Sequence, residues 1–213
     1  MQLALAIEKY LRYLVKLKNA SKYTLKNYSR ALGNFQEIVG AKTDLNKISL
    51  HHIDDLYDFL FELKNKKGEP LAASTKNLYL IPIRSFLKFC IKRDLGKNIL
   101  SPEKIELTKH TARDVSGLTP DELNRLRDFN EYKNPIIALR DHALIELFYS
   151  TGLRISELQA LNRDQINLNL GEFSVLGKGK KYRTVYLTPT ATEKLQKYFD
   201  VRIDNYPPAF LNA

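Results

Sequence analysis

The stretch Thr151-Gly-Leu-Arg-Ile-Ser-Glu-Leu158 marks the place where one predicted helix ends and the next begins. Gly152 can take the left-handed backbone conformation that ends a helix, so Arg154 stands at the start of the following one. An arginine there combines a planar fork of donors with unpaired backbone amides, which suits a phosphate oxygen. Glu157 could brace Arg154 or cap the turn, and the simpler alternative is an ordinary surface pair of the two side chains.

A second motif lies between Val175 and Leu187, where apolar residues alternate with period two on either side of Gly177-Lys-Gly-Lys180. This pattern predicts a β-hairpin with a glycine-rich turn. Its tip carries cations that could enter a DNA groove or reach a phosphate, namely Lys178, Lys180, Lys181 and Arg183. The alternative is a hairpin tip whose lysines only keep the surface solvated.

Upstream of both motifs, helical periodicity predicts a four-helix N-terminal domain over residues 1–97. Ser21 is the expected N-cap of the second helix and Gly40 its stop, while Ser74 opens the fourth helix. Pro82 inside that helix is expected to bend it or to split it into two pieces. The four predicted helices cover residues 3–18, 22–40, 52–63 and 74–93.

Residues 98–117 are predicted to be a linker, because the apolar periodicity fades there, and residues 118–213 form a second domain. Thr119-Pro-Asp-Glu122 matches a capping box with proline at the first helical position. The last helix is expected from Pro189, and the final residues 207–213 carry no folding signal. Other helices are predicted near residues 120–130, 136–151 and 155–161. The fold class is therefore mainly α with a small β-sheet.

The composition indicates either a polyanionic partner for the first half of the chain or only a solvated basic surface there. The 213 residues include 34 Lys and Arg against 24 Asp and Glu, a net charge of +10. Residues 1–110 alone hold 20 basic and 11 acidic residues, so nearly all of the excess lies in this half. Charged residues inside the first apolar stretch argue against a signal peptide, and no apolar run is long enough for a membrane span. A single cysteine, Cys90, fits a reducing cytoplasm.

The two motifs together resemble the tyrosine recombinase family, the phage integrases and Xer-type recombinases. That family has a Gly-Leu-Arg-x-x-Glu-Leu segment followed by a Gly-Lys-Gly-x-Lys-x-Arg hairpin, which match Gly152–Leu158 and Gly177–Arg183. Its Ser-x-x-Thr-x-x-x-Tyr helix start matches Ser21 through Tyr28, and its Leu-Thr-x-x-Glu-Leu segment matches Leu118 through Leu123. The resemblance extends from about residue 5 to residue 200.

The resemblance implies a SAM-like four-helix core-binding bundle followed by part of an α+β integrase catalytic domain, which together clamp double-stranded DNA. It implies that Arg154 holds the scissile phosphate and that Lys178 protonates the leaving 5′ oxygen. Other recombinase subunits would be partners in a synaptic complex, and no metal, cofactor, membrane or small-molecule substrate is expected. The DNA-binding residues expected on the helical domain are Lys22, Tyr23, Lys26, Asn27, Arg30, Lys76, Asn77 and Arg84.

Parts of the family pattern are missing from the sequence. The family places a His-x-x-Arg segment and a nucleophilic tyrosine after the hairpin, whereas here no histidine follows His142. Tyr198 and Tyr206 do come after the hairpin, but neither follows such a segment. We therefore expect a chain truncated midway through the catalytic domain, which binds DNA without cleaving it. The alternatives are a non-catalytic, site-occupying regulator and a helical protein–protein adaptor.

Overall fold

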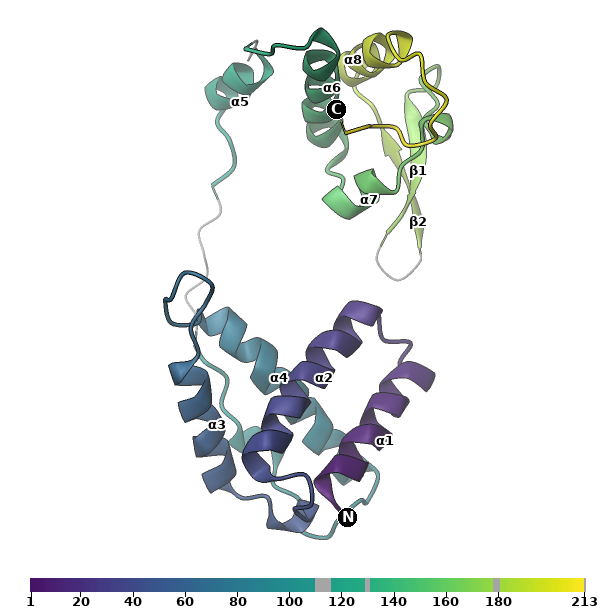
Figure 1. Ribbon diagram of the computed structural model, residues 1–213. Coiled ribbons are helices and arrows are strands. Elements are labelled where there is room, and N and C mark those ends of the chain that lie inside the picture. Colours follow the sequence, from purple (N-terminus) through teal and green to yellow (C-terminus); the bar gives the residue numbers. More distant parts are fainter. Residues whose placement is uncertain (110–115, 129–130, 178–180, 213) are drawn as a thin grey trace. The chain divides into compact units, whose positions relative to one another are not determined.

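A computed structural model describes residues 1–109, 116–128, 131–177 and 181–212 of the chain (Figure 1). It divides the chain into two compact units, which meet in sequence between residues 114 and 115. Each unit has its own hydrophobic core and is described by itself. Helices dominate both units and a single two-stranded sheet lies in the second, so within the described residues the fold class agrees with the sequence prediction.

Four helices build the N-terminal unit: α1 (Leu3–Lys16), α2 (Lys22–Val39), α3 (Leu50–Glu62) and α4 (Ala73–Lys92). Helix α4 packs against both α1 and α2, and α3 packs against α2. Each helix contributes one apolar stripe to the common core, as its periodicity predicts. Fully buried side chains at the centre include Tyr10, Leu32, Phe35, Leu56 and Phe86.

Both ends of α2 follow local sequence signals, whereas the start of α4 has no side-chain cap. The Ser21 hydroxyl accepts a hydrogen bond from the Thr24 amide at 3.1 Å, and Gly40 ends α2 with a φ of 92°. Helix α4 begins at Ala73 and runs past Pro82 to Lys92, so the alternative in which this proline splits the helix is wrong. Pro82 is buried, so packing against the surrounding core accompanies the loss of one backbone hydrogen bond within α4.

The first part of the predicted linker belongs to the N-terminal core. Residues 98–108 run along the bundle through a short 3₁₀ turn, η2 (Pro102–Lys104), and Ile105 is completely buried. The Tyr57 hydroxyl donates to the Glu106 carbonyl at 3.0 Å. Isolated apolar residues of this segment pack against the core, so its sequence shows no apolar periodicity. A second 3₁₀ turn, η1 (Leu45–Lys47), joins α2 to α3.

The C-terminal unit places helices around a β-hairpin. Strands β1 (Glu172–Leu176) and β2 (Tyr182–Tyr186) pair antiparallel, with Phe173 opposite Val185. Their alternate side chains point into a core that α6 and α8 complete by packing on each other. Thr119 and Glu122 form the capping box that the sequence predicts at the start of α5. The remaining elements are α5 (Pro120–Arg127), α6 (Pro135–Thr151), α7 (Ile155–Gln159), η3 (Arg163–Gln165) and α8 (Pro189–Asp200).

The C-terminal residues are fixed to this unit, although the sequence shows no folding signal there. Ala209 is fully buried, and the Phe210 ring stacks on Tyr198 with centroids 5.5 Å apart. Arg202, almost completely buried, donates to the carbonyls of Pro208 and Ala209. An arginine that satisfies backbone carbonyls of an irregular segment is a contact without a short sequence signature. Among the helices of the described residues, none has the length and apolarity to cross a bilayer.

Candidate nucleic-acid interface

Arg154 takes its position from a sharp turn between α6 and α7. Gly152 ends α6 with a φ of 60°, the left-handed conformation expected from the sequence. Two residues later the Arg154 amide donates to the Glu157 carboxylate at 2.8 Å, and the Arg154 Nη1 donates to the other carboxylate oxygen at 3.0 Å. Glu157 therefore both caps the turn and pairs with the Arg154 side chain. The Arg154 side chain remains 64% exposed, so most of its donors face solvent.

A second guanidinium reaches the same carboxylate from the hairpin. Arg183 on β2 donates from Nη1 and Nη2 to the two oxygens of Glu157, both at 2.8 Å. This is the bidentate geometry in which arginine–carboxylate pairs are strongest. Only 6% of the Glu157 side chain is exposed, against 37% of the Arg183 side chain. The sequence assigned Arg183 to DNA, whereas the structure commits two of its nitrogens to Glu157.

These contacts control the charge state of the cluster. Hydrogen bonds from Arg183, and next from the Arg154 amide, hold the pKa of Glu157 far below its ordinary value. The same carboxylate raises the pKa of Arg183. Glu157 and Arg183 are therefore ionised at neutral pH, and the two guanidinium groups share one negative charge. The cluster keeps a net charge of +1, with its exposed cation on Arg154.

Gly177 lets the base of the hairpin close over this cluster. Its amide donates to the Lys181 carbonyl at 2.8 Å, and a Cβ at this position would lie 3.1 Å from Nη1 of Arg183. Any larger residue would push against the guanidinium that holds Glu157. Of the other hairpin cations expected from the sequence, Lys181 is exposed, and Lys178 and Lys180 lie outside the described residues.

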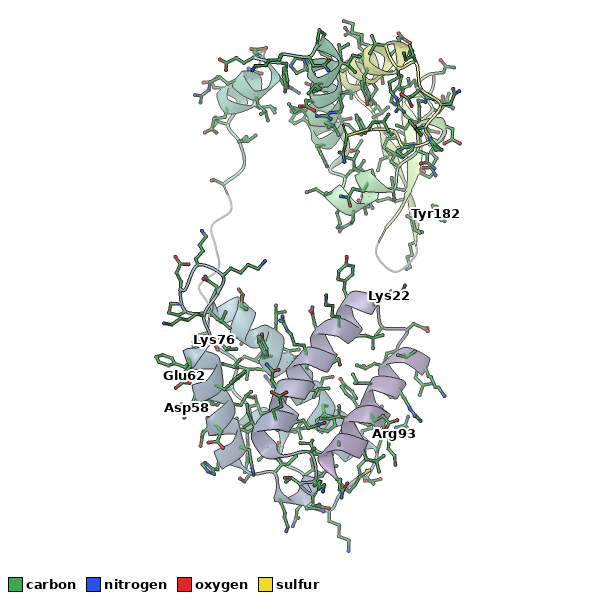
Figure 2. All side chains as sticks on the ribbon, viewed as in Figure 1. Lys22, Asp58, Glu62, Lys76, Arg93 and Tyr182 are labelled. Carbon is green, nitrogen blue, oxygen red and sulfur yellow. The ribbon has the colours of Figure 1, made fainter. Side chains whose placement is uncertain are left out.

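The first turns of α2 carry the polar side chains that the sequence assigned to DNA. Tyr23 is 82% exposed, and the Arg30 guanidinium lies 5.0 Å from the centre of the Tyr79 ring on α4. This cation–π contact fixes the direction of Arg30 across the junction of the two helices. Figure 2 shows Lys22 at the beginning of α2, pointing away from the bundle. The other exposed members of this face are Lys26 and Asn27.

The residues expected on α4 have more varied surroundings. The Lys76 ammonium lies 5.4 Å from the centre of the Phe61 ring, and Arg84 is half-buried in electrostatic range of Glu103. Asn77 is 9% exposed; its amide nitrogen donates to the Thr108 carbonyl at 3.0 Å and its oxygen accepts from the Thr108 amide at 2.8 Å. The expectation that Asn77 contacts DNA does not fit this geometry, because a backbone segment occupies both of its polar atoms.

The remaining chemistry-bearing side chains do not join this site. Tyr198 is 2% exposed and its ring is stacked inside the core, while Tyr206 is 65% exposed on the segment after α8. On α3, the His51 ring lies 3.6 Å from the Asp55 carboxylate. Within the described ranges, no group of three or more His, Cys, Asp or Glu residues is arranged to hold a metal ion.

Comparison with known proteins adds independent evidence on the fold. Residues 7–94 match the family model "Phage integrase, N-terminal SAM-like domain", and residues 116–210 match "Phage integrase family". The Tn1549 transposon integrase in complex with transposon right end DNA has a TM-score of 0.68 at 17% identity, over 97% of this chain and 67% of that one. A lambda integrase tetramer bound to a Holliday junction gives a TM-score of 0.66 at 19% identity, over 94% of this chain and 57% of the other. The fold is thus of the integrase class.

Sequence relatives identify the family of the chain within this fold class. Tyrosine recombinase XerC of Chlamydia caviae is 31% identical, over 94% of this chain and 70% of the relative. Tyrosine recombinase XerD of Oceanobacillus iheyensis is 33% identical, over 94% of this chain and 65% of the relative. XerC of Chlamydia trachomatis is 33% identical, and the chain spans 64% of its length. The chain belongs to the tyrosine recombinase, or phage integrase, family.

Proposed function

We propose that this chain binds duplex DNA as part of a site-specific recombination system, with Arg154 holding a backbone phosphate. The observation that carries this proposal is the cluster in which Glu157 accepts hydrogen bonds from both Arg154 and Arg183. The carboxylate fixes the direction of an exposed guanidinium and leaves the cluster one positive charge in excess. A phosphate monoanion is the ligand that balances this charge and matches the fork of guanidinium donors.

The N-terminal unit would supply most of the affinity. Its exposed cations and polar groups at the start of α2 suit phosphate contacts, and they belong to the half of the chain that carries nearly all of the net charge. The DNA complexes and the tetramer named for the structural neighbours support a DNA partner and further recombinase subunits. If about six phosphates are neutralised, affinity should fall about 10³-fold between 50 and 200 mM salt.

We propose further that this chain does not cleave DNA alone. Strand cleavage in this family needs a tyrosine beside the bound phosphate. Tyr198 is stacked inside the core, and neither Tyr198 nor Tyr206 follows a His-x-x-Arg segment. Lys178 would then contribute charge at the hairpin tip, and its role as the acid for the leaving 5′ oxygen would belong to a complete active site. A regulator that occupies recombination sites is the alternative function.

Fluorescence anisotropy with a labelled random-sequence duplex, titrated at several salt concentrations, tests the phosphate contact. Arg154→Ala should weaken binding and reduce the slope of log affinity against log salt by about 1, since one phosphate contact is lost. Arg125→Ala removes an exposed arginine from α5 of the same unit and is the matched control. Equal slopes for the wild type and Arg154→Ala would contradict the proposal.

Cleavage is tested separately on nicked duplexes, which trap a covalent intermediate. We expect no protein–DNA adduct that survives denaturing electrophoresis. An adduct mapped by mass spectrometry to Tyr198 or Tyr206 would show that the chain cleaves by itself. This outcome would overturn the second proposal and leave the phosphate contact intact.

A further inference from the structure

A basic pocket lies between α1 and the second half of α4 in the N-terminal unit. Its volume is about 270 Å³. On α4, the residues that line it follow one another at helical spacing and so share one face of the helix, namely Ser85, Lys88, Phe89 and Lys92. Arg93 comes directly after α4, and Figure 2 shows it beside α1. The other side of the pocket is formed by Tyr10, Tyr13 and Leu14 of α1 and by Lys18, which follows this helix.

Three packed aromatic rings line this pocket. The ring centroids of Tyr13 and Phe89 lie 4.8 Å apart, and those of Tyr10 and Phe89 lie 5.1 Å apart. Two cations approach the Tyr13 ring: the Lys18 ammonium lies 5.9 Å from its centre and the Arg93 guanidinium carbon lies 5.7 Å from it. These cation–π contacts bring two positive charges, one from the end of each helix, to the same ring.

The Ser85 hydroxyl offers a hydrogen-bond donor to a ligand in this pocket. Tyr10, which is 1% exposed, donates from its hydroxyl to the Ser85 Oγ at 2.7 Å. Burial raises the pKa of Tyr10 to about 12, so Tyr10 keeps its proton at neutral pH. The Ser85 side chain makes no other hydrogen bond within the described ranges. Because its oxygen accepts from Tyr10, its own proton can be donated into the pocket.

The positive charge of the pocket exceeds what its surroundings balance. No carboxylate in the described part of the chain forms an ion pair with its four cations, which are Lys18, Lys88, Lys92 and Arg93. The pKa of Glu103 is lowered chiefly by a hydrogen bond from Ser101 and in part by the charge of Lys88, so Glu103 offsets some of that charge. The C-terminal ends of α1 and α4 add about half a negative charge each. About two of the four positive charges therefore stay unbalanced.

We propose that this pocket binds a short phosphate chain, the chemical group shared by nucleoside triphosphates and inorganic polyphosphate. Lys18 and Arg93 hold the chain beside the Tyr13 ring, and the Ser85 hydroxyl donates to one of its oxygens. The planar fork of a guanidinium matches two phosphate oxygens, while ammonium groups act as point charges. A chain of phosphates also spreads its charge, so it can meet cations that come from two helices. This inference goes beyond the proposed function, because the pocket contains none of the residues assigned to DNA.

Isothermal titration calorimetry of the full chain with sodium tripolyphosphate, without divalent cations, tests the site. The pocket variant is Lys18→Gln with Arg93→Gln. The wild type should bind one tripolyphosphate per chain, and the dissociation constant should rise about tenfold or more in the variant, because two charge-assisted contacts are lost. Lys88→Gln with Lys92→Gln, which keeps both contacts with Tyr13, should weaken binding in the same direction. A parallel titration with ATP separates the two sources: tighter binding than tripolyphosphate indicates a nucleotide, and equal binding indicates inorganic polyphosphate.

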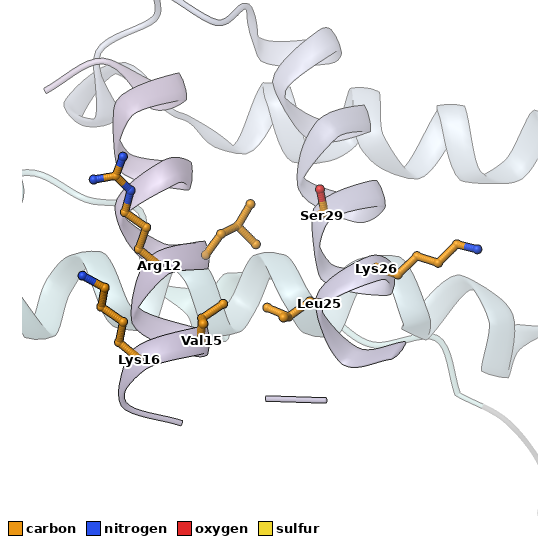
Figure 3. A pocket seen from close by; sticks show the side chains of 7 residues that line it. Arg12, Val15, Lys16, Leu25, Lys26 and Ser29 are labelled. Atoms are coloured by element: carbon orange, nitrogen blue, oxygen red, sulfur yellow. The ribbon is translucent and has the colours of Figure 1, made fainter. Parts of the chain in front are cut away.

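Lys26→Gln with Arg30→Gln is the matched control, because it also removes one lysine and one arginine that lies over a tyrosine ring. Figure 3 shows Lys26 extending from α2 away from α1. This control should bind tripolyphosphate like the wild type and duplex DNA more weakly, and the pocket variant should show the reverse. Circular dichroism should show the same helical content for every variant.

Two results would overturn the proposal. One is a wild type that binds no tripolyphosphate at millimolar concentration. The other is a loss of tripolyphosphate affinity in the control at Lys26 and Arg30 while the pocket variant binds normally, since the anion would then occupy the surface assigned to DNA.

Discussion

Replacing Asn77 by alanine separates a structural role from a role in DNA binding. The Asn77 amide makes two hydrogen bonds to the Thr108 backbone, at 2.8 and 3.0 Å, from a side chain that is 9% exposed. A hydrogen bond of this kind contributes about 1 kcal/mol net, and an unpaired backbone group costs a similar amount or more. Because Thr108 is half-buried, water can reach part of the freed backbone. We therefore expect a loss of about 2 kcal/mol in the free energy of unfolding.

That loss can be measured in two ways. For a unit of this size, 2 kcal/mol corresponds to a fall of about 8 °C in the Tm of the N-terminal unit, measured by calorimetry. Hydrogen exchange gives a local readout, because the Thr108 amide should lose its protection in Asn77→Ala while the centre of α4 keeps it. The loosened segment is residues 98–108, which the sequence assigned to a linker.

Asn27→Ala is the control, since it removes the same side chain from the exposed start of α2. It should leave the Tm unchanged and weaken DNA binding. Asn77→Ala, assayed well below its Tm, should bind DNA as the wild type does. A tenfold loss of affinity in Asn77→Ala together with an unchanged Tm would refute the structural role and restore the DNA contact.

Three further predictions follow from buried and paired groups. Glu157→Gln should lower both the Tm and the DNA affinity. Because folding depresses the pKa of Glu157, the ionised carboxylate stabilises the fold above pH ~4.3, and this stabilisation is lost as the pH falls further. The difference in Tm between the wild type and Glu157→Gln should therefore shrink on acidification. Cys90 is fully buried with its thiol pKa raised to about 12, so iodoacetamide at pH ~8 should label it only in denaturant, and rapid labelling of the native chain would contradict this. Phe210→Ala removes a ring stacked on Tyr198 and should cost about 2 kcal/mol in chemical unfolding, whereas no change would mean that the C-terminal segment adds no stability.

The parts of the fold that could be predicted are those whose cause is local. Ser21 caps α2, Gly152 ends α6, and Thr119 with Glu122 caps α5, because each contact joins residues at most four positions apart. The hairpin was predictable for a similar reason, since alternation fixes which side chains face the core. The predicted helices agree with the observed ones except within a few residues of their ends.

The errors share a physical origin in contacts between distant positions. Asn77 meets Thr108 across 31 residues, and Arg202 holds carbonyls of a segment that has no periodicity. Pro82 is buried inside α4, so packing against the core accompanies the loss of one backbone hydrogen bond. In each case the contact depends on residues far apart in the sequence, so a short stretch of sequence cannot predict it.

The candidate site combines one local contact with one contact between distant positions, and both are made by Glu157. Its contact with Arg154 is local and was predictable from spacing, whereas its contact with Arg183 depends on the register that sets Val175 opposite Arg183. The consequence is that the hairpin and the start of α7 are not independent. Loss of the Arg183 guanidinium would leave Arg154 as the one ion-pair partner of Glu157 among the residues that the structure describes, and the exposed donors of Arg154 would turn inward. A substitution at Arg183 would therefore reduce phosphate binding through Arg154, even if Arg183 itself never touches DNA.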